Sequence, residues 1–356
     1  MSRVTPDDVV RHFRENGLKM LLHHPGNVRE LMTLRDPDRS ARMDFTRLTV
    51  AKDTFVAADY RHLACDLVVK VPYRTRLGGR RRTLTLYILI EHQSEPDLVM
   101  MLRVLDYLVQ VYKAQVRSAT REGQRLRADF RLDPVLPIVL YTGERGWEAM
   151  TTLIELVEGG NADFAEVVPQ LRPLFLNLSA TPPAELEAAG GFLGWVLELL
   201  RARHGPRDEY SATTDRVVSQ LEAMAETERE RWMLFLSYID AMVYHDRPDA
   251  EHKRLREIVL NAIRSDPRRR EVEAMMKTHA DVLREEGRKE GRQAEKCESR
   301  QEILLSQLRE RFGRVPRPVV QVIRTTNDIS RLNEWLVKFA TAHTLEDMGI
   351  TAQTDE

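Results

Sequence analysis

Residues 64–91 read ACDLVVKVPYRTRLGGRRRTLTLYILIE and contain two β-rich runs on either side of a Gly-Gly pair. The runs at residues 64–71 and 84–91 are rich in β-branched and aliphatic side chains, which favour strands. Gly78 and Gly79 can adopt the positive φ angles that a tight reversal needs. The stretch therefore predicts an antiparallel hairpin.

The chain beyond this hairpin predicts a crossover to a third strand. Apolar residues between positions 98 and 112 recur at three- and four-residue steps, which indicates an amphipathic helix after Pro96. A third apolar run, LPIVLY at residues 136–141, predicts a strand. A hairpin followed by a strand-helix-strand crossover gives both strand orientations, so we expect an α/β fold with a mixed sheet and flanking helices. A helical region broken near Pro25 is expected over residues 6–32.

The composition and the secondary-structure patterns of the sequence divide the chain into four segments. Strand patterns are confined to residues 1–180, which predict the α/β domain, and helical patterns fill residues 184–283, which predict a helical domain. Residues 284–300 read REEGRKEGRQAEKCESR and predict a charged, exposed helical connector. Residues 301–356 predict a small helical module. We expect the helical C-terminal region to be the surface through which any homo-oligomer forms.

Composition excludes several classes of protein. Lys and Arg total 54 against 55 Asp and Glu, so a net charge of -1 gives no general attraction to polyanions. The two cysteines, Cys65 and Cys297, lack metal-ligand spacing, and no run approaches the roughly 18 uncharged residues of a membrane span. No phosphate loop, dinucleotide fingerprint or nucleophile elbow occurs, so no nucleotide cofactor is expected. These features predict a cytoplasmic protein with no membrane partner.

Two acids lie where the predicted hairpin would bring them together. Asp66 lies in the first run and Glu91 ends the second. Adjacent carboxylates repel each other unless a divalent cation lies between them. Gln93, two residues after Glu91, faces the same side of a strand, and its amide could orient a water molecule. Oxygen ligands suit Mg²⁺ or Mn²⁺, which also bind substrate phosphates, so the pattern predicts phosphodiester hydrolysis.

A purely structural interpretation accounts for the same acids. Asp66 could cap a neighbouring loop, and Glu91 could pair with an arginine such as Arg81 or Arg103. Buried acids are often simply satisfied by such partners. The spacing of the residues leaves both interpretations open.

Three segments resemble a known bacterial family. They are DTFVAADYRHLACDLVVKV from residue 53, YILIEHQSEPDLVMMLRVLDYLVQVY from residue 87 and LPIVLYTGERGW from residue 136. They are similar to the recombination-promoting nucleases (Rpn, or YhgA-like transposases), a branch of the PD-(D/E)XK nuclease superfamily. The most specific element is Glu91-His92-Gln93, which resembles the family's E-x-Q version of the superfamily's (D/E)-x-K motif.

The resemblance implies a restriction-endonuclease-like fold over residues 1–180, a divalent metal and DNA cleavage. Asp66 and Glu91 would be metal ligands, and the backbone carbonyl of His92 would be a third. Gln93 would take the place of the usual lysine, so that the metal must activate the attacking water while the amide holds it. Glu15 and Lys19 are loose counterparts of an acid and a lysine in the family's N-terminal helix.

Basic residues crowd the predicted hairpin and give it a candidate role in DNA binding. Arginines can bind the phosphates of DNA. A turn rich in arginine that is simply exposed to solvent is also common. The alternative function is a non-catalytic DNA-binding or assembly protein that keeps the fold of a nuclease. The hairpin residues in question are Arg74, Arg76, Arg80, Arg81 and Arg82.

Overall fold

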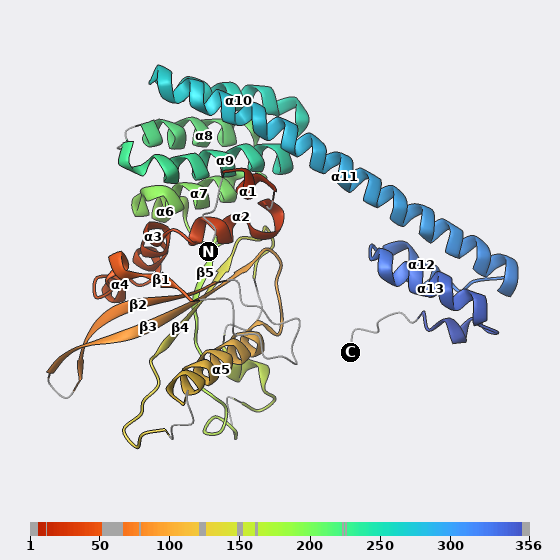
Figure 1. Ribbon diagram of the computed structural model, residues 1–356, viewed down its shortest axis with the longest axis horizontal. Helices are drawn as coiled ribbons and strands as arrows, with labels where there is room; N and C mark the ends of the chain where they lie inside the picture. The colour runs from red at the N-terminus through yellow and green to blue at the C-terminus, as the bar shows by residue number, and fades with distance from the viewer. Residues whose placement is uncertain are drawn as a thin grey trace. The chain divides into compact units, whose positions relative to one another are not determined.

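The computed structural model describes residues 6–11, 13–51, 67–77, 80–120, 126–147, 152–160, 163–222, 224 and 226–350. The chain divides into two compact units, Met1–His279 and Ala280–Glu356. The sequence predicts a passage from an α/β domain to a helical domain between residues 180 and 184. This position falls inside the first unit, which therefore contains both the sheet and most of the helices (Figure 1).

A five-stranded mixed sheet in the order β1-β2-β3-β4-β5 forms the centre of the first unit. Strands β1 to β3 pair antiparallel, and β3, β4 and β5 pair parallel, which confirms the mixed sheet predicted from the sequence. The strands are β1 (Thr49–Val50), β2 (Leu67–Leu77), β3 (Arg80–Gln93), β4 (Val135–Tyr141) and β5 (Leu174–Asn177).

The hairpin of β2 and β3 has the expected pairing. Leu67 lies opposite Ile90 and Leu77 lies opposite Arg80, so the ladder runs the full described length of β2. The central positions are buried because both faces of the sheet are covered, which explains the nearly continuous apolar run of β3. Gly78 and Gly79, predicted to form the turn, lie outside the described residues.

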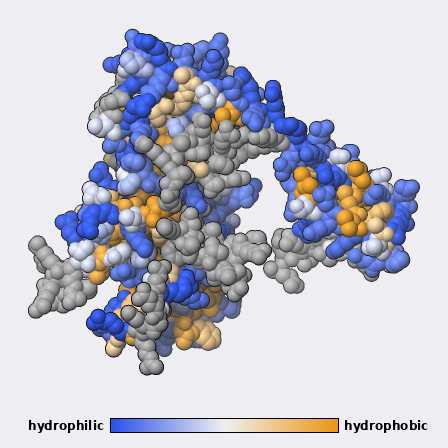
Figure 2. Space-filling view, viewed as in Figure 1, coloured by the Kyte–Doolittle hydropathy of each residue, from blue (hydrophilic) through white to orange (hydrophobic). Residues whose placement is uncertain are grey.

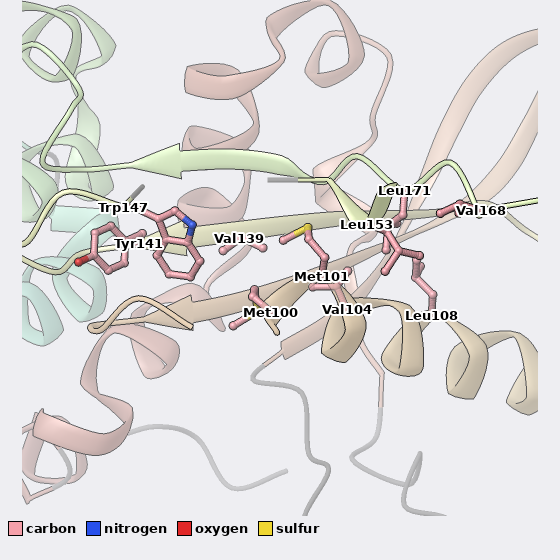
Figure 3. Close-up of a cluster of buried hydrophobic side chains, with 10 residues drawn as sticks. All are labelled: Met100, Met101, Val104, Leu108, Val139, Tyr141, Trp147, Leu153, Val168 and Leu171. Atoms are coloured by element: carbon pink, nitrogen blue, oxygen red, sulfur yellow. The ribbon is translucent and has the colours of Figure 1, made fainter. Parts of the chain in front are cut away.

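Helix α5 (Met100–Ala119) covers one face of the sheet, as the crossover predicted. Its inner side packs Met101, Val104 and Leu108 against β4 and the loops that follow it (Figure 3). Val139 and Tyr141 of β4 are fully buried in this cluster. The described part of the sheet region also contains the 3-10 turns η1 (Phe45–Arg47) and η3 (Leu153–Leu156).

The N-terminal helices pack against the helical part of the same unit. The helical region predicted over residues 6–32 is confirmed and has its expected break immediately before Pro25. Gly17 permits a close approach, since a Cβ atom there would lie 3.0 Å from the ring of Tyr238 in helix α9 (Arg229–Asp246). The N-terminal helices are α1 (Pro6–Arg11), α2 (Phe13–Leu22), α3 (Pro25–Arg35) and α4 (Pro37–Ser40).

The remaining helices of this unit stack in layers beside the sheet (Figure 1). Two of them, α7 and α9, are buried along most of their length, because other helices pack on several of their sides. The helices are α6 (Pro183–Ala189), α7 (Gly191–Ala202), α8 (Arg207–Glu222), η4 (Glu226–Glu228), α9 (Arg229–Asp246) and α10 (Asp249–Ala262).

The second unit has its own hydrophobic core. Helix α11 (Asp266–Phe312) is continuous across the unit boundary. Its described side chains between residues 284 and 296 are exposed, but Cys297, inside the predicted connector, is buried. Leu304 and Leu308 of α11 pack with Leu332 and Trp335. The other elements are α12 (Arg317–Thr325), α13 (Ile329–Thr341) and η5 (Glu346–Met348).

The described surface is mostly hydrophilic on the face in view, with smaller hydrophobic patches on both units (Figure 2). Among the described residues, no helix combines the length and apolar character that crossing a membrane requires.

Candidate functional site

The Glu91-His92-Gln93 motif forms the carboxyl end of β3, beside the carboxyl end of the parallel strand β4. Glu91 lies opposite Val139, and Gln93 lies opposite Tyr141. The Glu91 side chain is only 2% exposed. Ligand sites in α/β sheets commonly lie at the carboxyl ends of parallel strands, so the motif lies where a functional site is expected.

Glu91 faces helix α5 and carries an ion pair there. The Arg103 guanidinium donates from one terminal nitrogen to Oε1 of Glu91 at 2.8 Å. The Gln93 amide donates to the same oxygen at 3.1 Å. Gln93 and Glu91 therefore lie on one face of β3, as strand alternation predicts. A buried carboxylate is costly unless such donors compensate its charge.

Arg103 is fixed by two further partners. Its second terminal nitrogen donates to Asp97 at 2.7 Å, and the nitrogen that contacts Glu91 also donates to the Tyr107 hydroxyl at 3.2 Å. Burial disfavours the charged guanidinium, but the bonds with Tyr107 and Asp97 and the charge of Glu91 outweigh it and raise the pKa of Arg103. The guanidinium therefore stays charged at every physiological pH.

This contact selects between the two arginines considered as partners of Glu91. Arg103 is the observed partner. Arg81 pairs with Arg76 near the other end of the hairpin. Arg81 precedes Glu91 by ten residues on the same strand, a separation of roughly 33 Å at about 3.3 Å per residue. Arg81 therefore cannot be the partner of Glu91.

The His92 side chain faces the opposite side of β3, as alternation predicts. Its Nε2 shares a hydrogen bond of 2.8 Å with the Thr142 hydroxyl in the segment after β4. His92 and Thr142 line a cavity of about 170 Å³ whose other walls come from α2, α7 and α9. Arg203 also donates to the Thr142 carbonyl at 3.0 Å, so the helical region supports the end of the strand pair.

A glycine allows the two strand ends to approach closely. A Cβ atom on Gly143 would lie 2.3 Å from the Ser94 carbonyl and 2.3 Å from the Tyr141 hydroxyl. The Tyr141 hydroxyl itself donates to the Arg145 carbonyl at 2.6 Å. The residue after Thr142 therefore has to be small for the segment following β4 to lie against the end of the motif.

The other candidate site residues divide by position. Asp66 lies outside the described residues, and Glu15 belongs to α2 but its side chain is outside the described set. Lys19 is half-buried on α2. Nothing in the described contacts brings Lys19 to Glu91.

The basic hairpin lies far from the motif. Arg74 is exposed, and its guanidinium donates to the Ala41 carbonyl at 3.0 Å. The ladder pairs Thr75 with Arg82 and Leu77 with Arg80, which places these arginines toward the end of the hairpin remote from Glu91. The side chains of Arg76, Arg80, Arg81 and Arg82 are outside the described set. These arginines and the motif cannot contact one and the same phosphate.

The Glu91 carboxylate is a hard oxygen ligand of the kind that Mg²⁺ prefers, and its Oε1 already accepts hydrogen bonds from the Arg103 guanidinium and the Gln93 amide. Within the part of the chain that the structure describes, no group of three or more His, Cys, Asp or Glu side chains could hold a metal ion. A set of three such side chains would therefore have to include a residue outside the described ones, and the predicted ligand Asp66 lies there.

The site around Glu91 also includes Arg103, Asp97 and Tyr107. Of these, only Arg103 was identified from the sequence, as one of two arginines that could pair with Glu91. The available signal was helical spacing: Arg103 and Tyr107 are four residues apart on α5, so they lie on the same side. Asp97 precedes the helix and could not be placed by periodicity.

The chain matches a family model described as "Putative transposase, YhgA-like" over residues 14–232. This chain belongs to the YhgA-like family. The matched region contains the whole sheet, the Glu91-His92-Gln93 motif and the first helices of the helical region. The family resemblance drawn from the motif segments is thereby confirmed.

A curated relative of this family member is the recombination-promoting nuclease RpnD of Escherichia coli O157:H7. The two are 29% identical over 128 residues, which are 36% of this chain and 44% of the relative. The match thus spans less than half of the relative's length. No protein of solved structure shows significant similarity to this chain.

Proposed function

We propose that this chain is a metal-dependent DNA endonuclease whose site is built on the carboxyl end of β3. The observation that carries the proposal is the buried Glu91 carboxylate, which shares one face of the strand with Gln93 in a member of the YhgA-like family. The relative named as a recombination-promoting nuclease supports the same reaction class.

The register of the hairpin supports Asp66 as the second acid. Leu67 pairs with Ile90. Asp66 precedes Leu67, and Glu91 follows Ile90, so one further ladder position would place the two acids opposite each other on one face. Asp66, Glu91 and the His92 carbonyl would then hold Mg²⁺ or Mn²⁺. Such an ion, when bound, lowers the pKa of a coordinated water toward neutrality.

Gln93 would orient that water but would not remove its proton. An amide donates and accepts hydrogen bonds but carries no positive charge, unlike the lysine of the superfamily motif. Its amide nitrogen already lies at hydrogen-bond distance, 3.1 Å, from an oxygen of Glu91, one of the proposed ligands. We therefore assign Gln93 a role in positioning.

The hairpin arginines would bind the DNA backbone away from the cleavage point. Arg74 is exposed, and the other four arginines follow it in the sequence of the same hairpin. Since the net charge of the chain is only -1, DNA binding must depend on such local clusters. Contacts of this kind fix register without reading sequence.

A plasmid-nicking assay tests the proposal. The wild type should nick supercoiled DNA with Mg²⁺ and not with EDTA. Asp66→Ala and Glu91→Gln should each lower the nicking rate by more than about a hundredfold. A residue that only supports a metal ligand is expected to cost about a hundredfold at most, so a larger loss indicates a ligand. The matched control is Glu95→Gln, which removes an exposed acid two residues beyond the motif and should keep wild-type activity. Wild-type activity in Asp66→Ala would contradict the assignment.

One contact favours the alternative of a non-catalytic DNA-binding protein. Arg103 already satisfies the charge of Glu91, so the site can be stable without a metal. Binding of DNA without hydrolysis, unaffected by Mg²⁺ or EDTA, would identify this alternative in the same assay.

A further inference from the structure

The Glu91 oxygen is surrounded by donors of unequal charge. Gln93 contributes a neutral amide at 3.1 Å, and Arg103 contributes a guanidinium at 2.8 Å. A lysine at position 93 would carry a positive charge, and Gln93 carries none. In this chain the positive charge beside the same oxygen comes from Arg103 on helix α5.

Arg103 has an anionic partner besides Glu91. Asp97 binds one of its terminal nitrogens at 2.7 Å, independently of the nitrogen that contacts Glu91. The Arg103 side chain is 34% exposed, whereas that of Glu91 is 2% exposed. The guanidinium therefore lies between the buried carboxylate and solvent, where a phosphate of bound DNA would approach.

A divalent cation and Arg103 would compete for Glu91. Two positive groups bound to one carboxylate oxygen lie only a few ångströms apart and therefore repel each other strongly. Asp97 would keep the guanidinium at the site once its bond to Glu91 is lost. A planar guanidinium with free donors is well suited to a phosphodiester.

We propose that Arg103 supplies the positive charge missing from Gln93: it neutralises Glu91 in the metal-free protein and binds the scissile phosphate when a metal is held by Glu91. This inference rests on the proposed function, because it assumes a metal at Glu91. It makes Arg103 a substrate-binding residue and Asp97 its positioning residue.

The first test is metal affinity, measured by calorimetric titration of Mn²⁺ at pH 8 without DNA. Removing the competing cation in Arg103→Gln should tighten the Kd for Mn²⁺ roughly tenfold, the size of effect that a charge within a few ångströms produces. Arg117→Gln is the matched control, since Arg117 is an exposed arginine in the last turn of the same helix. It should leave the Kd for Mn²⁺ unchanged.

The second test is DNA affinity, measured by fluorescence anisotropy with Ca²⁺ or with EDTA. Arg103→Gln should weaken binding roughly tenfold in Ca²⁺, because it removes a charge-assisted phosphate contact, and should change it little in EDTA. Arg103→Lys keeps a positive charge and should retain most of the Ca²⁺-dependent affinity. Arg117→Gln should behave as the wild type in both conditions. Thermal denaturation of each variant shows whether it is folded.

Several outcomes would overturn the inference. An unchanged Kd for Mn²⁺ in Arg103→Gln, or equal losses of DNA affinity in Arg103→Lys and Arg103→Gln, would show that the charge does not act as proposed. If the wild type nicks plasmid while either result is found, the proposed function stands and only the role of Arg103 fails. If neither the wild type nor Arg103→Gln binds Mn²⁺, both proposals fail.

Discussion

The buried carboxylates that the structure describes in the first unit are paired in the same way. Glu91, Glu198 and Asp240 are each almost fully buried, and each pairs with an arginine. Arginine is well suited to this role because its guanidinium is more weakly hydrated than an ammonium group. The ion pair of Glu91 is therefore not by itself a sign of catalysis. What distinguishes Glu91 is its place at the end of a parallel strand pair, with the Gln93 amide on the same oxygen.

The ring of His24 makes the start of α3 sensitive to pH. His24 is the N-cap of this helix, and its Nδ1 accepts a hydrogen bond from the Gly26 N–H at 3.2 Å. Burial and the nearby charge of Arg231 lower the pKa of His24, and Glu228 opposes them only in part. The folded protein therefore binds fewer protons at this ring than the unfolded chain. The stability from this ring is complete above the unfolded pKa of about 6.5 and is lost as the pH falls below it.

We expect His24→Asn to flatten this dependence, because asparagine is a good N-cap that does not titrate. Thermal denaturation between about pH 5 and pH 7.5 measures it: the wild type should lose more stability on acidification than the variant. His23→Asn is the control, since the adjacent His23 ring bonds the Lys19 carbonyl at the end of α2 and does not cap α3. Equal losses in the wild type and His24→Asn would contradict the assignment.

At the scale of elements, the segment after β4 fixes the end of β3. Gly143→Ala would force a methyl group to within 2.3 Å of the Ser94 carbonyl, so the two strand ends must separate. We expect a loss of about 1–3 kcal/mol in the free energy of unfolding, as for other overpacked sites. If the proposed function holds, plasmid nicking should also fall, because Ser94 follows Gln93 directly. Urea denaturation provides the stability measurement.

Gly146→Ala is the matched control for this prediction. It lies in the same segment, and a Cβ atom there would meet nothing within 4 Å. Its effect should be near zero or slightly stabilising, because alanine restricts the unfolded chain more than glycine does. Similar losses in both variants would show that the segment is generally sensitive and that the contact with Ser94 is not the cause.

Local sequence was enough to predict β2, β3, α5 and β4, because the strands are apolar runs rich in aliphatic and β-branched residues and α5 has a clear repeat of three to four residues. Strand β5 was missed: its four residues, LFLN, are too short to show a period. The Glu91 to Arg103 contact could be stated only as one option among two, because it depends on how the crossover packs α5 on the sheet. Asp97 in the loop before α5 has no periodic pattern at all.

At the scale of the whole molecule, stability is divided between two cores. Leu197 is fully buried in α7 of the first unit, and Leu332 is fully buried in the second. Leucine to alanine changes at such positions cost about 2–5 kcal/mol, because they lose buried area and leave a cavity. Since the described cores of the two units are separate, a single free energy of unfolding does not describe this chain.

Differential scanning calorimetry of the full chain should therefore resolve two transitions. We expect Leu332→Ala to lower the midpoint of one transition only and Leu197→Ala to lower the midpoint of the other. The smaller enthalpy should belong to the transition that Leu332→Ala shifts, because unfolding enthalpy scales with the number of residues and the second unit is the shorter one. The continuous helix α11 is the element that could couple the units. One transition that both substitutions shift equally would show that α11 transmits unfolding across the boundary at residue 280.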